Sequence, residues 1–215
     1  MKQNLEDLRK NYSSRKLDRS MVTTNPIDQF NVWFQEAVDV MGSREPNAMS
    51  LATATTNGMP SVRMVLLKGV SEAGFVFYTN FKSRKGKELT QNPNAALCFF
   101  WEPLERQVRI EGTLTQMSHA DSERYFQSRP KKSQIGASVS LQSAVITDRS
   151  VLEQEAERLT EQYKDADVLP CPDHWGGFVL KPSHVEFWQG RPSRLHDRLL
   201  YTEEGGVWKL ERLAP

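Results

Sequence analysis

The segment Met49-Ser-Leu-Ala-Thr-Ala-Thr-Thr-Asn-Gly-Met-Pro-Ser-Val-Arg-Met-Val-Leu-Leu-Lys68 predicts two β-strands joined by a tight turn. The second strand begins near Ser61 and continues to Val70, shortly after the dipeptide Asn57-Gly58. This dipeptide favours a β-hairpin turn because both residues tolerate a positive φ. A turn this short can join only antiparallel strands, so the segment indicates an antiparallel sheet.

Strand patterns also dominate the rest of the chain. The segment 95–101 is apolar throughout, as in a strand buried on both faces, whereas 106–116 alternates and predicts one buried face. Gly205-Gly206 offers a second hairpin turn. After the first hairpin, strands are predicted at 75–79, 95–101, 106–116, 177–188, 195–201 and 207–213.

Short helices are predicted between these strands. Asn25 and Pro26 suit the N-cap and first position of a helix that Gly42 ends. Asp148 can cap another helix. The remaining helical patterns cover 83–91 and 118–127, and Pro130 limits the second of these. Because βαβ alternation, a GxGxxG motif and a Walker-type loop are absent, the predicted fold is mainly β, with antiparallel strands closed into a small barrel.

Length and charge restrict the class of protein. The 215 residues predict a flexible N-terminal arm over 1–24 and a single domain over 25–215. A net charge of +1 argues against a nucleic-acid binder. Cys98 and Cys171 are too few and too distant for a disulfide framework. No signal peptide and no stretch of roughly 20 apolar residues is present, so we expect a cytoplasmic protein without a membrane span.

One arginine lies in an otherwise apolar strand. In the segment 61–68, Arg63 points to the side opposite Met64 and Lys68. An unpaired buried guanidinium is costly, so Arg63 needs an acidic partner. A core carboxylate and a bound phosphate are equally suitable partners, and the strand alone does not choose between them.

Two further segments carry groups that can bind an anion. Ser83-Arg84-Lys85 lies at a predicted helix start, where free N–H groups favour anions, although a solvated basic turn is the more common meaning of this motif. Tyr125, Arg129 and Ser133 recur every four residues around a helix end and can converge on one phosphate. A basic helix C-terminus explains the same spacing.

The most specific local pattern is near the C-terminus. Trp188, Arg194, His196 and Arg198 fall within eleven residues, and in an extended chain the last three lie on one face. Three groups that can all be positive repel one another unless an anion lies among them. The other histidines are scattered without metal-ligand spacing, so we predict no metal site.

The ordered set of motifs resembles the pyridoxine (pyridoxamine) 5′-phosphate oxidase family over nearly the whole chain. Each motif is weak alone, but their order is specific. The matching motifs are Arg63-Met-Val-Leu-Leu-Lys68, Phe77-Tyr-Thr-Asn80, Ser83-Arg-Lys85, Glu105-Arg-Gln107, Tyr125-Phe-Gln-Ser-Arg-Pro130, Ser133-Gln-Ile-Gly136, Gln142-Ser143, Phe187-Trp-Gln-Gly190 and Arg194-Leu-His-Asp-Arg198.

The resemblance implies an FMN-binding split β-barrel, Greek-key-like and antiparallel with peripheral helices, that forms a homodimer with FMN at the subunit interface. It places FMN contacts at Arg63, Met64, Val65, Leu66, Leu67, Lys68, Tyr78, Thr79, Arg84, Lys85, Gln107, Gln142, Ser143, Trp188 and Arg198. It places substrate contacts at Arg9, Tyr12, Lys68, Tyr125, Arg129, Ser133, Arg194 and His196, with the last two as the catalytic pair.

The implied reaction is the oxidation of pyridoxine 5′-phosphate and pyridoxamine 5′-phosphate to pyridoxal 5′-phosphate, in vitamin B6 biosynthesis and salvage. Oxygen accepts the electrons and gives H2O2, and the amine substrate also gives ammonia. Alternatives are another split-barrel flavoprotein, such as a flavin reductase or a non-catalytic FMN binder, a small-barrel nucleic-acid binder, and a carrier of pyridoxal phosphate.

Overall fold

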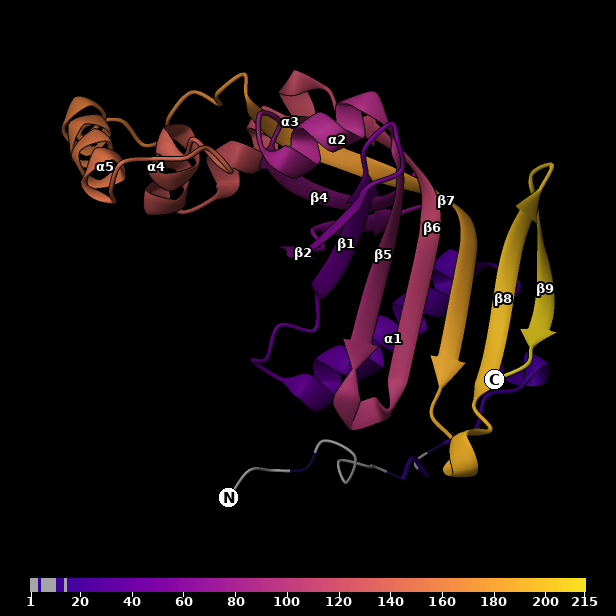
Figure 1. The fold of residues 1–215 in the computed structure, drawn as a ribbon. Coiled ribbons are helices and arrows are strands. Elements are labelled where there is room, and N and C mark those ends of the chain that lie inside the picture. Colours follow the sequence, from indigo (N-terminus) through magenta and orange to yellow (C-terminus); the bar gives the residue numbers. More distant parts are fainter. Residues whose placement is uncertain (1–3, 5–10, 14) are drawn as a thin grey trace. The chain divides into compact units, whose positions relative to one another are not determined.

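The computed structural model describes residues 4, 11–13 and 15–215 (Figure 1). Arg9, one of the predicted substrate-binding residues, lies outside the described residues. The strands are β1 Ala48–Ala54, β2 Pro60–Leu66, β3 Gly69–Ser71, β4 Gly74–Asn80, β5 Asn94–Trp101, β6 Arg106–Gln116, β7 Trp175–Gln189, β8 Asp197–Glu204 and β9 Val207–Leu213. The α-helices are α1 Pro26–Met41, α2 Arg84–Gln91, α3 His119–Ser128, α4 Lys131–Val139 and α5 Ser150–Gln162.

The strands form one hydrogen-bonded sheet in the order β2-β1-β5-β6-β7-β4-β3, and β8 pairs with both β7 and β9. The long strand β7 has two different partners along its 15 residues. Its first part pairs antiparallel with β4, from Asn80↔Trp175 to Phe75↔Leu180. Its last part pairs antiparallel with β8, from His184↔Thr202 to Gln189↔Asp197. The mainly antiparallel class predicted from the sequence is therefore confirmed.

The chain divides into two compact units. Unit 1 comprises the described residues up to Ser50, with Ala96–Glu111 and Pro182–Pro215. Unit 2 comprises Leu51–Ala95 and Gly112–Lys181. The strands β1, β5, β6 and β7 contribute residues to both units, so neither unit is a contiguous piece of sequence. The single domain predicted over 25–215 stays a prediction.

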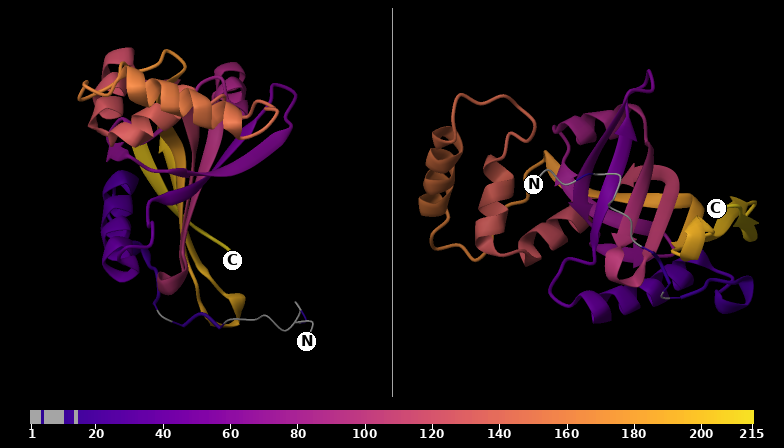
Figure 2. Two further views of the ribbon diagram at one scale, coloured as in Figure 1. Left: turned by 90° about the vertical axis from the view of Figure 1, so that its left-hand side faces the viewer. Right: turned by 60° about the horizontal axis from the view of Figure 1, so that its bottom comes forward.

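In unit 1, α1 lies against one face of the strands (Figures 1 and 2). Phe30 is fully buried, and its ring contacts that of Phe99 edge to face at a centroid distance of 5.1 Å. Trp33 contacts Phe187 in the same way at 5.1 Å, and Arg106 covers the other side of the indole at 4.1 Å. The helix therefore supplies the aromatic core that its sequence pattern predicts.

The start of α1 is fixed by its predicted cap. The Asn25 side chain accepts a hydrogen bond from the backbone N–H of Ile27 at 2.8 Å, and Pro26 occupies the first helical position. We expect Asn25→Ala to lower the free energy of unfolding by about 1 kcal/mol, because a backbone N–H loses its acceptor. Urea unfolding checks this value. An Asn25→Asp variant, which keeps an acceptor, should lose much less; equal losses would contradict the capping role.

In unit 2, three helices build a second core. Phe126 of α3, Ile135 of α4 and the segment around Cys171 pack with Trp175. Helix α5 adds Ala156 and Leu159, and Tyr163, directly after the helix, packs against the same core. Helices α4 and α5 lie side by side in Figures 1 and 2.

Helix α4 is absent from the sequence prediction. Pro130 ends α3 as expected, yet it also serves as the N-cap residue of α4. The fixed φ of proline and its lack of an N–H suit the start of a helix as well as its end. A single Pro130 signal therefore marks two helices that follow each other directly.

Two strand details differ from the prediction. Strand β5 is buried on one face only, because Leu97, Phe99 and Trp101 are buried while Phe100 is 50% exposed. The prediction of burial on both faces is wrong: an apolar run does not by itself identify a fully buried strand. The first hairpin has a longer turn than expected, in which Gly58 alone of its dipeptide has a positive φ, of 82°.

The described part of the predicted N-terminal arm contacts unit 1. Leu17 is buried, and its backbone N–H donates to Asp197 Oδ2 at 3.0 Å. The backbone N–H of Ser13 donates to Glu105 Oε2 at 2.9 Å. Tyr201 Oη donates to the backbone oxygen of Thr23 at 2.6 Å. Residues 11–13 and 15–24 are thus held by hydrogen bonds at both ends of this stretch.

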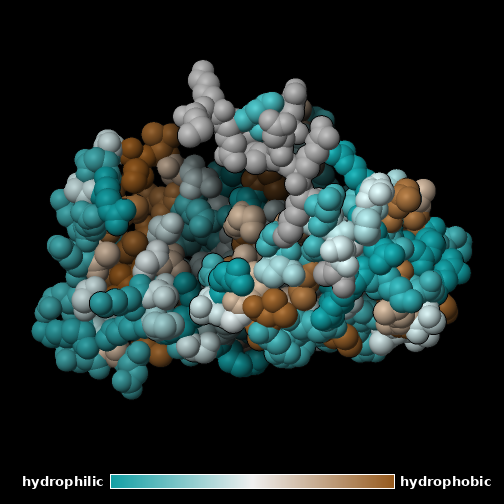
Figure 3. Space-filling view, turned by 90° about the horizontal axis from the view of Figure 1, so that it is seen from below, coloured by the Kyte–Doolittle hydropathy of each residue, from teal (hydrophilic) through white to brown (hydrophobic). Residues whose placement is uncertain are grey.

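The surface carries charges of both signs, in keeping with the net charge of +1. The face in Figure 3 is mostly hydrophilic, and its hydrophobic residues form separate groups. Exposed apolar side chains include Val62 and Met64 of β2. Within the described part of the chain, no helix is both long and apolar enough to cross a membrane.

Candidate functional site

Unit 2 contains a cavity of about 510 Å³, lined from β2, β4, α2, α3, α4 and the loop that follows α4. This cavity collects most of the unit 2 residues that the sequence predicts as site residues. Those that line it are Met64, Val65, Leu66, Lys68, Tyr78, Thr79, Lys85, Tyr125, Arg129, Ser133 and Gln142. Residues from segments more than seventy positions apart in the sequence therefore meet at one site.

Four predicted cofactor residues of unit 2 do not line the cavity. The Leu67 side chain is buried in the core, and Ser143 is exposed with a φ of 71°. Arg63 and Arg84 instead belong to a polar network beside it, described next. These four remain predictions as cofactor contacts.

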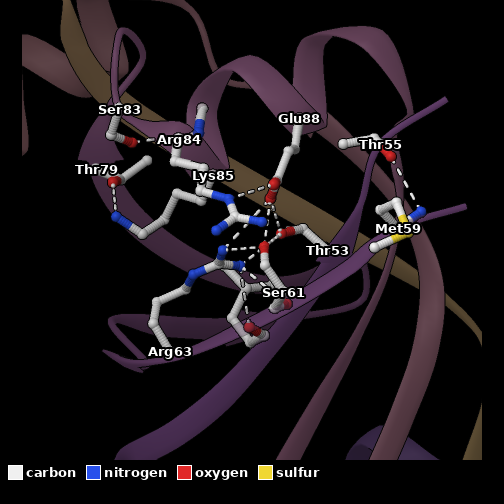
Figure 4. Close-up of polar contacts among 12 residues, drawn as sticks. Thr53, Thr55, Met59, Ser61, Arg63, Thr79, Ser83, Arg84, Lys85 and Glu88 are labelled. Carbon is white, nitrogen blue, oxygen red and sulfur yellow. Dashed lines mark hydrogen bonds and ion pairs between the residues drawn. The ribbon is translucent and has the colours of Figure 1, made fainter. Parts of the chain in front are cut away.

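The network is centred on a buried carboxylate, Glu88 of α2 (Figure 4). Arg63 donates to Glu88 Oε2 at 3.3 Å and also bonds the hydroxyls of Thr53 and Ser61. Arg84 donates to Glu88 Oε1 at 2.9 Å. Of the two partners considered for Arg63, the structure therefore provides a core carboxylate.

The ionisation of Glu88 reflects these contacts. Burial alone would raise the pKa of this carboxyl group, but hydrogen bonds from Ser61, Thr53 and Arg84 outweigh burial and lower the pKa to about 2. Glu88 is thus a permanent negative charge at physiological pH. Locally, Glu88 has only the common i,i+4 pairing with Arg84, and its other partners Thr53 and Arg63 lie 35 and 25 residues away, so the sequence analysis did not identify it.

A pH dependence of stability follows from this shift. The pKa of Glu88 is depressed from 4.5 to about 2, so its ionised form stabilises the fold fully above pH 4.5 and that contribution is lost as pH falls toward 2. We expect the free energy of unfolding of the wild type to fall more steeply over this range than that of Glu88→Gln. Urea unfolding at a series of pH values measures both slopes, and parallel curves would contradict the assignment.

Lys85 points from α2 toward the cavity. Its Nζ donates to Thr79 Oγ1 at 3.2 Å and to Gln142 Oε1 at 2.8 Å (Figure 4 shows the first contact). Burial, and then the positive charge of Arg63, lower the pKa of Lys85. Gln142, which has no local sequence signal of its own, is therefore brought to the same point as Lys85 and Thr79.

A second cation, Arg129, lies at another part of the cavity wall. Its Nη1 atom is buried and has no hydrogen-bond partner among the described residues. The guanidinium lies over the rings of Trp175 at 4.9 Å and Phe126 at 5.8 Å, and burial lowers its pKa. A half-buried guanidinium with one buried nitrogen left unpaired by the described residues is unfavourable by itself, so this position favours an anionic ligand.

Aromatic rings connect the two cations. Tyr78 stacks on Tyr125 at a centroid distance of 3.9 Å and on Trp175 at 5.3 Å. Burial, and then the neighbouring Tyr125, raise the pKa of Tyr78, so its hydroxyl stays protonated at neutral pH. Trp175 also lines the cavity, but it was not predicted as a site residue. It contacts Arg129, which lies 46 positions away, and its neighbours in the sequence do not distinguish it from a core tryptophan.

The remaining predicted residues belong to unit 1. An aromatic cluster is formed by Tyr12, Trp188 and His196. Its ring centroids are 5.6 Å apart for Tyr12 and Trp188, 4.6 Å for Trp188 and His196, and 5.9 Å for Tyr12 and His196. A Cβ atom on Gly190 would approach the Tyr12 ring to 2.7 Å, so the absence of a side chain there lets the ring pack. The backbone N–H of Arg191 donates to His196 Nδ1 at 3.1 Å, which leaves Nε2 as the nitrogen that can carry a proton in the neutral ring. Gln107 is partly buried on β6.

The prediction that Arg194, His196 and Arg198 share one extended face is wrong. Arg194 ends a short 3-10 turn, is exposed and has a φ of 62°, and His196 precedes β8. Only Arg198 lies on the strand, opposite Trp188. Arg198 makes two bonds to Glu186, at 2.8 and 3.0 Å, so a carboxylate of β7 supplies the negative charge that the sequence analysis assigned to a ligand.

Comparison with known proteins identifies the family of this chain. The pyridoxamine 5′-phosphate oxidase family description matches residues 35–163, and the pyridoxine 5′-phosphate oxidase C-terminal dimerisation region matches residues 175–215. The pyridoxine/pyridoxamine 5′-phosphate oxidase of Salinibacter ruber is 54% identical over 213 residues, which cover 98% of this chain and 99% of that protein.

Solved structures give the same result for the fold. PhzG from Burkholderia lata, in complex with tetrahydrophenazine-1-carboxylic acid, superimposes with a TM-score of 0.87 and 31% identity, covering 94% of this chain and 100% of that one. A pyridoxamine 5′-phosphate oxidase-related, FMN binding protein from Nostoc punctiforme has a TM-score of 0.68 at 20% identity, covering 86% and 97%, and this likeness concerns the fold alone. With its split β-barrel fold and these matches, the chain belongs to the pyridoxamine 5′-phosphate oxidase family of oxidoreductases.

Proposed function

We propose that this protein oxidises pyridoxine 5′-phosphate and pyridoxamine 5′-phosphate to pyridoxal 5′-phosphate, with FMN as cofactor and O2 as electron acceptor. One observation carries the proposal: a single cavity has two separate cationic positions, Lys85 at one and Arg129 at the other. A cofactor phosphate and a substrate phosphate need two such positions. The names of the relatives at 54% identity support the same reaction.

The residues around α2 fit the phosphate of FMN. Arg84 and Lys85 occupy the first turn of a helix whose N-cap is Ser83, and the free N–H groups there favour an anion. Met64, Val65 and Leu66 line the cavity with apolar side chains and backbone groups that suit a planar ring system. Bound FMN would supply the redox chemistry by accepting a hydride from substrate C4′ and passing the electrons to O2, which gives H2O2.

The substrate phosphate would be held by the second set. Arg129 offers a buried guanidinium, and Tyr125 and Ser133 offer hydroxyl groups on the same cavity wall, with Lys68 nearby on the chain after β2. These contacts lie away from the reacting carbon, so their binding energy serves to orient the substrate. Arg194 would orient the pyridine ring, and His196 would position it or move a proton at Nε2.

We further propose a homodimer with FMN at the subunit interface. The C-terminal dimerisation region of the family, matched by residues 175–215, supports a dimer. This region carries Trp188, Arg194, His196 and Arg198, so dimer formation would bring these residues to the cofactor sites together with Tyr12 and Gln107.

A second candidate is oxidation of a ring system without phosphate, because PhzG was solved with tetrahydrophenazine-1-carboxylic acid. Arg129 could pair with the carboxylate of such a compound as well as with a phosphate, so the experiment has to separate the two candidates. The test is incubation of the FMN-loaded protein with each compound under air. We expect pyridoxal 5′-phosphate, oxygen uptake and H2O2 from both vitamin compounds, with ammonia from the amine alone. Turnover of the phenazine precursor without pyridoxal 5′-phosphate formation would favour the second candidate and contradict the first.

A further inference from the structure

The buried carboxylate of Glu88 lies among the basic residues at the start of α2. Glu88 is only 4% exposed, and both of its carboxylate oxygens are used (Figure 4). Oε2 accepts hydrogen bonds from Thr53 Oγ1 at 2.5 Å and Ser61 Oγ at 2.6 Å. Oε2 also faces Arg63, and Oε1 accepts from Arg84. One side chain therefore joins β1, β2 and the first turn of α2.

The charges in this cluster suggest why a carboxylate is needed. Arg63, Arg84 and Lys85 are three cations; burial, and then the positive charge of Arg63, lower the pKa of Lys85. Glu88 removes one of the three positive charges and leaves two. A phosphate monoester carries about −1.5 to −2 charges at pH 7, so the cluster with Glu88 matches it closely.

The two arginines use Glu88 differently. The terminal nitrogens of Arg63 are taken up by Glu88, Thr53, Ser61 and the backbone oxygen of Leu51 at 3.2 Å. Arg84 uses only its Nε for Glu88 and is largely exposed, so its terminal nitrogens can reach a ligand. The bond from Nε fixes the plane of this guanidinium group.

We propose that Glu88 is a positioning residue for the cofactor phosphate: it orients Arg84 without touching the cofactor itself. This inference rests on the proposed binding of FMN. It assigns Arg63 a supporting part as well, since Arg63 holds the carboxylate in place from β2. Loss of Glu88 should therefore weaken recognition of the phosphate and leave recognition of the flavin ring nearly intact.

The experiment compares FMN with riboflavin, which has the same ring but no phosphate. Binding to the full-length apoprotein is measured by the change in flavin fluorescence, without any turnover. We expect Glu88→Ala to weaken FMN binding about 10-fold, the loss of one charge-assisted contact, while riboflavin affinity stays the same. Glu72→Ala, an exposed glutamate before β4 in the same unit, is the matched control and should change neither affinity.

Glu88→Gln tests the same positioning role with a side chain of similar size, so that no cavity is left. Its amide oxygen can still accept from Thr53 and Ser61, but its NH2 group cannot accept from Arg84. We expect a smaller loss than in Glu88→Ala, and no further loss when Glu88→Gln is added to Arg84→Met, because both changes break the same contact. A merely structural carboxylate would give additive losses.

The outcomes distinguish the positioning role of Glu88 from the binding of FMN itself. If the wild type prefers FMN to riboflavin but Glu88→Ala keeps that preference, or if losses in the double variant add, the positioning role is overturned. If the wild type binds both flavins equally, the cluster does not hold a cofactor phosphate, and the cofactor assignment falls with it. Selective loss of FMN affinity together with non-additivity supports the proposal.

Discussion

Replacing Arg129 with methionine will raise the KM for pyridoxine 5′-phosphate by roughly 10- to 100-fold. A hydrogen bond to a charged group contributes about 1.5–3 kcal/mol, and about 1.4 kcal/mol corresponds to a tenfold change in affinity. The guanidinium packs on Trp175, and its buried Nη1 is unpartnered among the described residues, so a phosphate would be its main counter-ion. Steady-state kinetics with each phosphorylated substrate measures the effect.

Two controls define this prediction. Arg124→Met removes an exposed arginine of α3, the helix that ends just before Arg129, and its KM should stay at the wild-type value. Stability of the ligand-free Arg129→Met protein should not fall, because the change removes a cation whose buried Nη1 has no partner among the described residues. An unchanged KM, or an equal loss of activity toward unphosphorylated pyridoxine, would contradict a phosphate-binding role for Arg129.

Replacing Arg194 with leucine will lower kcat by about 100-fold while FMN stays bound, the size typical of losing one group that stabilises a transition state. Arg194 is exposed and makes no hydrogen bond or ion pair with another described residue, so its loss should not change folding. Single-turnover kinetics and the flavin content of the purified variant measure the two effects separately.

The backbone at Arg194 sharpens this test. Ser193 and Arg194 both have positive φ, of 57° and 62°, which costs about 1–3 kcal/mol for residues with a side chain. Arg194→Gly should therefore raise the free energy of unfolding and lower kcat as much as the leucine variant does. Arg44→Leu, another exposed arginine of unit 1, is the control. Normal turnover in either Arg194 variant would show that the assigned role is wrong.

Local features of the fold could be predicted from the sequence because short-range chemistry determines them. Asn25 and Pro26 start α1, and Gly205 with Gly206 turns the last hairpin with φ values of 63° and 89°. Each signal requires only neighbouring residues. Helix α4 was missed because Pro130 carries two meanings at once.

Long-range contacts could not be predicted in the same way. The pairing of Arg63 with Glu88 and the packing of Arg129 on Trp175 depend on how distant segments meet. The left-handed backbone at Ser193 and Arg194 could not be predicted either, because serine and arginine seldom adopt a positive φ. The ordered family motifs predicted a set of site residues, but they could not show that Glu186 neutralises Arg198.

The central claim is that a flavin bound by this chain oxidises a phosphorylated B6 compound. The most direct measurement is the visible absorbance of the FMN-loaded protein after pyridoxine 5′-phosphate is added without oxygen. We predict that the flavin absorbance bleaches with one equivalent of substrate per FMN and returns when air is admitted. A protein that takes up no FMN, or an FMN-loaded protein whose absorbance stays unchanged, would contradict the claim.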